Sequence, residues 1–133
     1  MMKSLYIFCV MIAFGLASVQ GAVPAYANSA PASSDFIEPA SVLSPEEVVE
    51  IQLLGLQAAG TDRRAGIEQV WRFAHPDNRK MTGPISRFSQ LFDLPAYAPL
   101  IGLQDYVIND RKLSDTEARF VITIRATDGK DYF

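Results

Sequence analysis

Apolar residues follow a helical period from residue 43 onward. The run Ser44-Pro45-Glu46-Glu47 is typical of a helix start: Ser44 can cap, Pro45 suits the first helical position, and Glu47 can complete a capping box. A broad apolar face follows, which predicts a well-buried helix that ends at Gly60. The residues of this face are Val48, Val49, Ile51, Leu53, Leu54 and Leu56.

The same period predicts two further helices. Asp62 can cap the second, and we expect Pro76 to stop it, because a proline disfavours helical geometry in the residue before it. Its apolar stripe is Ile67, Val70, Trp71 and Ala74. We interpret residues 75–82 as a loop. Gly83-Pro84 then opens the third helix, with the stripe Ile85, Phe88, Leu91 and Phe92.

After Gly102 the pattern changes to the alternation of half-buried antiparallel strands. Tyr106 and Ile108 share one side of a strand, and Phe120, Ile122 and Ile124 share one side of the next. The polar stretch 109–115 predicts a hairpin loop. Helices that precede strands favour an α+β fold, with three N-terminal helices packed on a curved antiparallel sheet.

Prolines and a glycine predict two tight turns. Pro95 and Pro99 flank Tyr97, and we expect a rigid turn that brings the Tyr97 ring back onto the helices. Asp128-Gly129 is typical of a hairpin turn. Residues 130–133 resemble the start of a returning strand, so we expect the natural chain to continue and its C-terminal strands to be truncated here; the alternative is a short natural edge strand.

The N-terminus has the three parts of a secretory signal: Lys3, an apolar run of 12 residues from Leu5 to Leu16, and small residues before a cut after Ala27 or Gly21. A retained membrane anchor is the alternative, although this run is shorter than the roughly 20 residues that span a bilayer. We therefore predict a signal peptide over 1–27, a flexible leader over 28–42 and a single α+β domain over 43–133. The protein would be exported, to the periplasm or the medium.

Cleavage after Ala27 removes one basic residue and the single cysteine. The remaining 11 basic and 15 acidic side chains give a net charge of −4. A mildly acidic domain has no general attraction to nucleic acid or to anionic membranes. Without cysteine it has no disulfides, no thiol catalysis and no thiolate metal site. We expect no cofactor and no metal.

His75 is the first candidate for chemistry, since a histidine beside the carboxylate of Asp77 could act as a general base. Its alternative role is a helix-end residue whose ring bonds a terminal carbonyl. Tyr97 is a further weak acid/base candidate. These three residues are the weak catalytic candidates.

Residues 62–87 carry six basic side chains against three acidic ones, in a chain that is otherwise acidic. If Arg79, Lys80 and Arg87 converge, they could hold a phosphate or a carboxylate. The alternative is a solvated face that pairs with the acidic first helix. The aromatic residues of this region either belong to the hydrophobic core or form the wall of a ligand pocket. The candidate ligand-binding residues are Trp71, Asn78, Arg79, Arg87 and Tyr97.

Five short motifs resemble those of an uncharacterised bacterial and plastid family, the domain-of-unknown-function family numbered forty-eight sixty-four. They are Ser44-Pro45-Glu46-Glu47-Val48-Val49, Phe73-Ala74-His75-Pro76-Asp77-Asn78-Arg79, Thr82-Gly83-Pro84, Arg87-Phe88 and Pro95-Ala96-Tyr97-Ala98-Pro99-Leu100. The resemblance implies a cone-shaped fold, similar to the nuclear-transport-factor-2-like and cystatin-like group, and no activity. Family members often have Ser in place of His75, which counts against an essential histidine. They also continue beyond Asp128-Gly129.

The leading hypothesis is a non-enzymatic exported domain that binds a small molecule or a protein partner. The concave sheet and residues 78–87 would form its contact surface. The alternative is a small cone-fold enzyme, such as a hydrolase, isomerase or dehydratase, with His75 or Tyr97 as acid/base. A third is a structural fragment that needs further strands. The sequence leaves the oligomeric state open.

Overall fold

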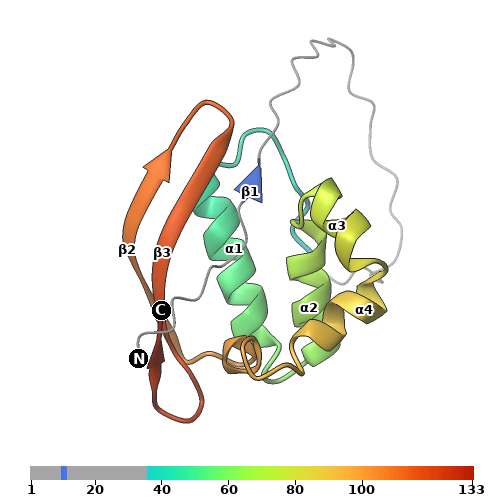
Figure 1. Ribbon diagram of the computed structural model, residues 1–133, viewed down its shortest axis with the longest axis vertical. Helices are drawn as coiled ribbons and strands as arrows, with labels where there is room; N and C mark the ends of the chain where they lie inside the picture. Colours follow the sequence, from blue (N-terminus) through green and yellow to red (C-terminus); the bar gives the residue numbers. More distant parts are fainter. Residues whose placement is uncertain (1–9, 12–35) are drawn as a thin grey trace, which may run out of the picture.

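The computed structural model describes residues 10–11 and 36–133. Its helical part comprises α1 (Pro45–Ala58), α2 (Arg63–Arg72), α3 (Pro76–Thr82), α4 (Ile85–Leu91) and a 3-10 turn at Ala98–Leu100. The strands are β1 (Val10–Met11), β2 (Asp105–Leu113), β3 (Glu117–Arg125) and β4 (Asp131–Tyr132). The α+β class is therefore confirmed, with helices first and most of the sheet after them (Figure 1).

The predicted signal peptide and the first part of the leader lie outside the described residues, apart from Val10 and Met11. These two residues pair with the start of β3, where Val10 lies opposite Ala118. Within the described ranges, no helix has both the length and the apolar character needed to cross a membrane.

Helix α1 lies between the β2–β3 hairpin and α2, while α3 and α4 lie on the far side of α2 from the hairpin (Figure 1). One apolar core joins these layers. Its buried residues are Val49, Leu53, Leu56, Ile67, Val70, Phe88, Phe92, Leu100, Leu103, Ile122 and Ile124. The space between the helices and the sheet is therefore filled with side chains.

Helices α1 and α2 cross with almost no space between their backbones. A Cβ atom added at Gly66 would lie 2.4 Å from the Gly55 carbonyl oxygen and 2.6 Å from the Ala59 Cα. Only a residue without a side chain allows this approach. The crossing fixes the position of α2, which carries most of the candidate site.

Several local predictions are confirmed. Ser44 and Glu47 form the capping box of α1, and Asp62 caps α2 by accepting the Ala65 N–H. Gly129 has a φ of 76° in the turn before β4, a conformation that favours glycine. The Tyr97 ring packs against the core, as the turn of residues 95–99 predicts.

Two loop predictions are wrong. Residues 75–82 contain α3, so the helical layer has four α-helices in the described residues and not three. Helix α2 already ends at Arg72, and Pro76 occupies the first turn of α3, where its missing N–H costs nothing. The His75 side chain caps this helix.

The predicted hairpin loop over 109–115 is also wrong. Strand β2 continues to Leu113, which pairs with Ala118, and only residues 114–116 connect the two strands. The ladder shifts register between Ile108 and Asp110, which places a bulge at Asn109. Polar side chains persist in this strand because much of its far half is exposed to solvent. The Tyr106–Ile124 and Ile108–Ile122 pairs confirm the predicted inner face.

Candidate functional site

An open groove of about 950 Å³ lies on the helical side of the molecule, away from the sheet. Helices α2 and α4 form its walls, and Arg79 of α3 and residues 38–39 of the leader complete it. Its lining residues are Glu38, Pro39, Arg63, Arg64, Ile67, Glu68, Trp71, Arg72, Arg79, Ile85, Ser86 and Ser89. Four arginines against two glutamates make this lining cationic in a chain of net negative charge.

The apolar part of the groove connects directly to the core. The half-buried Trp71 ring lies 5.0 Å from the ring of Phe88, which in turn meets Phe92 edge-on at 5.4 Å. Ile85 also lines the groove and keeps 37% of its surface exposed. These side chains offer a rigid apolar surface beside the arginines, since aromatic stacks of this kind restrain their members.

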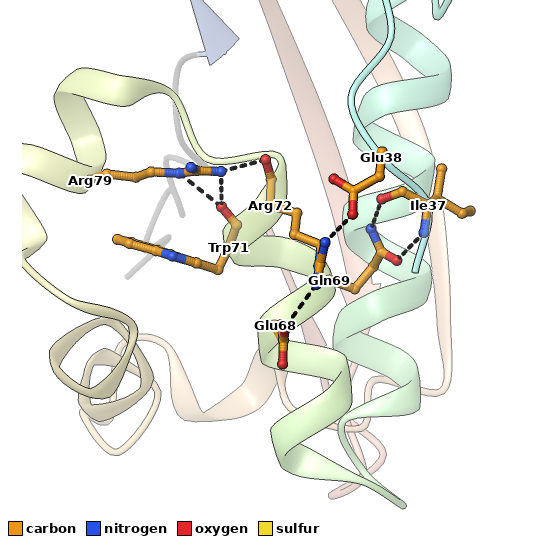
Figure 2. A network of polar contacts seen from close by, with 7 residues as sticks. All are labelled: Ile37, Glu38, Glu68, Gln69, Trp71, Arg72 and Arg79. Carbon is orange, nitrogen blue, oxygen red and sulfur yellow. Dashed lines mark hydrogen bonds and ion pairs between the residues drawn. The ribbon is translucent and has the colours of Figure 1, made fainter. Parts of the chain in front are cut away.

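Arg79 reaches back from α3 to the end of α2 (Figure 2). Its Nε and Nη2 donate to the Trp71 carbonyl oxygen at 3.1 and 2.7 Å, and Nη2 also donates to the Arg72 carbonyl at 2.5 Å. The guanidinium carbon lies 5.3 Å from the Trp71 ring centroid. The last carbonyls of a helix lack partners within the helix, so Arg79 caps α2 and holds α3 against it.

Arg72 lies at the centre of a second set of contacts. Its Nη1 bonds the Glu38 carboxylate, its Nη2 bonds Glu68 at 2.9 Å, and its guanidinium stacks 4.4 Å from the Phe36 ring centroid. Its Nε is enclosed and has no acceptor among the residues that the structure describes. With the leader in place, the Arg72 side chain keeps only 30% of its surface exposed.

Gln69 holds the leader by its backbone (Figure 2). The Ile37 N–H donates to Gln69 Oε1, and Gln69 Nε2 donates to the Ile37 carbonyl, both at 2.9 Å. The side-chain amide of Gln69 thus accepts one hydrogen bond from the Ile37 backbone and donates one to it. Paired residues of neighbouring antiparallel strands exchange two hydrogen bonds in the same way. Residues 36–38 are thus attached to α2 through side chains 32 and 34 positions away in the sequence.

Two further arginines flank the groove. Arg63 bonds the carboxylate of Asp93 at 2.6 Å. Arg64 is exposed and makes no hydrogen bond or ion pair with any residue of the described ranges. Within the described residues, Arg64 is therefore the arginine of the groove that lacks a partner, whereas Arg63, Arg72 and Arg79 each have one.

The predicted catalytic candidates lie elsewhere. Nδ1 of His75 accepts the Asp77 N–H at 3.2 Å as the cap of α3, and the Asp77 carboxylate lies 3.7 Å from the same nitrogen. Asp77 also bonds Lys80 at 3.2 Å. Tyr97 packs against the core, and neither it nor His75 lines the groove. His75 is therefore a helix-end residue: it lies at the N-terminus of α3, and its ring accepts a backbone hydrogen bond.

The structure brings two of the five predicted ligand residues together, namely Trp71 and Arg79. The backbone carbonyl of Asn78 accepts the Thr82 hydroxyl within α3, and Arg87 is exposed on α4 with its aliphatic stem near Gly83. Gln69 and Arg72 were not identified from the sequence as site residues. Their roles depend on the leader, and no local pattern reports a contact across more than 30 residues.

The pKa shifts near the β3–β4 turn are of structural origin. Hydrogen bonds from Arg125 hold the pKa of the Asp131 carboxyl below its usual range. In the sheet, burial raises the pKa of Tyr106, with a further contribution from Glu50. In the described part of the chain, no three His, Cys, Asp or Glu side chains come together to hold a metal ion.

Comparison of the chain with protein-family models, with curated proteins and with solved structures gives no match.

Proposed function

We propose that this protein is a non-enzymatic, exported binding domain whose groove between α2 and α4 takes a ligand with an anionic group and an apolar part. Export rests on the signal pattern of residues 1–27. The resemblance described above adds the proposal of a cone-shaped fold, and helices packed on an antiparallel sheet are compatible with it.

The observation that carries this proposal is that the guanidinium of Arg64, which has no partner among the described residues, lines the same groove as the apolar surface of Trp71. A carboxylate or phosphate on Arg64 would form a charge-assisted hydrogen bond, roughly twice as strong as one between neutral groups. The apolar part of the ligand would lie against Trp71 and Ile85. A groove with a few polar groups around an apolar wall is the common form of a small-molecule site.

An enzyme that uses His75 has less support. One ring nitrogen of His75 is engaged with the α3 backbone, and the residue does not line the groove. An enzyme that uses Tyr97 also has less support, because the Tyr97 ring packs against the core and does not line the groove.

Trp71 is the only tryptophan in the chain, so its fluorescence reports directly on the groove. We would titrate the full chain with octanoate and with hexyl phosphate, using hexanol as the neutral control. We expect a saturable change in emission with the two anions, at affinities at least five-fold above hexanol.

The variant Arg64→Gln should weaken anion binding about five-fold or more, and the matched exposed variant Arg87→Gln should leave it unchanged. An absent saturable signal, or equal losses in the two variants, would overturn the proposal.

A further inference from the structure

The leader segment Phe36–Glu38 is held on α2 in the manner of a bound peptide, through one backbone contact and two side-chain contacts. Gln69 bonds both the N–H and the carbonyl of Ile37 (Figure 2). The ring of Phe36 and the carboxylate of Glu38 both meet the guanidinium of Arg72. The α2 surface thus already recognises a short stretch of polypeptide.

Each contact specifies a different property of that stretch. Gln69 contacts only backbone atoms of Ile37, and Ile37 keeps 48% of its surface exposed, so the side chain at the middle position is free to vary. The guanidinium of Arg72 contacts the aromatic ring of the first residue and the carboxylate of the third. The resulting pattern is aromatic, any residue, acidic.

From these contacts we propose that the α2 face binds an extended segment of a partner protein with this pattern, and that the chain's own leader is its intramolecular occupant. This site adjoins the groove, since Arg72 and Glu38 belong to both, and the inference therefore rests on the proposed function. The positive lining suits an acidic segment, and main-chain bonds with side-chain selection are a common mode of peptide recognition.

The leader is an exchangeable occupant. Glu38 keeps 63% of its side chain exposed, and an exposed ion pair contributes little to stability. Arg72 Nε stays enclosed without an acceptor in the described part of the chain, and a buried donor left unpaired is unfavourable. Among the described residues, the docked leader thus leaves one donor of Arg72 unpaired, which favours its exchange for another segment.

Competition between the leader and a partner has a predictable size. A segment on a short tether has an effective concentration of about 1 mM at its site. If a free peptide of this pattern binds with a Kd of about 0.1 mM, the docked leader raises its apparent Kd about ten-fold. Weakening the leader must therefore strengthen binding in trans.

The test uses the full chain and a fluorescein-labelled peptide with the sequence of residues 36–41. Fluorescence anisotropy is measured with the unaltered chain and with the double variant Phe36→Ala/Glu38→Gln, after circular dichroism has shown that both are folded. We expect the double variant to bind the peptide about ten-fold more tightly. A peptide with serine in place of the isoleucine should bind equally well, while one with glutamine in place of the glutamate should bind at least five-fold less tightly.

Adding Gln69→Ala to the double variant should weaken peptide binding at least five-fold, while Gln90→Ala, at an exposed glutamine of α4, should not change it. Failure of the double variant to bind, or equal effects of the two glutamine substitutions, would overturn the inference. If the peptide fails while octanoate still binds through Arg64, the proposed function survives and the inference does not. If neither the peptide nor octanoate binds, both the proposed function and this inference are wrong.

A second copy of the chain is the other possible source of the segment. Sedimentation velocity on the unaltered chain distinguishes this case, because leader exchange would produce a dimer that Phe36→Ala/Glu38→Gln abolishes. A monomer at all concentrations supports a separate partner. A dimer of this kind would overturn the inference as stated.

Discussion

The Arg79 guanidinium caps the helix that carries Trp71: its Nη2 lies 2.7 Å from the Trp71 carbonyl oxygen, and the same group lies over the Trp71 ring. One side chain from α3 therefore fixes both the end of α2 and one wall of the groove. Stability and groove geometry depend on the same contact.

We expect Arg79→Ala to lower the free energy of unfolding by about 2 kcal/mol, because it leaves helix-end carbonyls without their charged donor. Arg79→Lys should recover only part of this loss, since an ammonium cannot reproduce the forked contact. Urea denaturation followed by Trp71 fluorescence measures both. Arg87→Ala is the control and should change stability by less than about 0.5 kcal/mol. Equal effects at the two positions would contradict the capping role.

His75 should behave as a cap and not as a catalyst. We expect His75→Ala to lower the free energy of unfolding by about 1 kcal/mol, because the Asp77 N–H loses its acceptor. His75→Ser should retain the stability of the unaltered chain, since serine is a preferred capping residue. Thermal unfolding of the three proteins gives the comparison. If serine is as harmful as alanine, the ring has another role.

The α1–α2 crossing should tolerate no side chain at its closest point. We expect Gly66→Ala to destabilise the protein by about 3 kcal/mol, because its Cβ would overlap the α1 backbone. Gly55→Ala is the matched control on the facing helix, where the nearest atom would lie at 3.1 Å. There the gain in helix propensity of about 1 kcal/mol offsets the crowding. Chemical denaturation should give the unaltered chain and Gly55→Ala a clearly higher free energy of unfolding than Gly66→Ala.

The capping box of α1 should make the protein acid-sensitive. The backbone N–H and then the hydroxyl of Ser44 hold the pKa of the Glu47 carboxyl below its usual value of 4.5. A lowered folded-state pKa gives stability that is complete above 4.5 and is lost as the pH falls through the lower folded value. Urea midpoints between pH 3 and 7 should therefore fall less steeply in Glu47→Gln than in the unaltered chain. Glu50→Gln, on the exposed side of the same helix, should not share this effect.

The sequence predicted those features that depend on neighbouring residues. The bond between Ser44 and Glu47 spans three positions, and the turn at Gly129 depends on the φ of one residue. Pro76 was misinterpreted because a proline is compatible both with the end of one helix and with the first turn of the next. Only the His75 side chain, which caps α3, decides between these two cases.

The site was predicted only in part. Trp71 and Arg79 were identified by type and by the local excess of positive charge, and the groove joins them. Gln69 gave no signal, because a glutamine on a helix is ordinarily a solvated residue and its partner Ile37 lies 32 positions earlier. Contacts of this kind follow from the packing of whole segments and not from any motif.

The antiparallel pair α1 and α2 joins residues that are close neighbours along the chain, as does the β2–β3 hairpin. Contacts of short sequence separation close small loops, so they cost little chain entropy and form quickly. We therefore expect each pair to form early in folding, and the two to dock through the core afterwards. The leader must close a loop of some 30 residues to reach Gln69, so its attachment should be among the last events of folding and among the first contacts to open again.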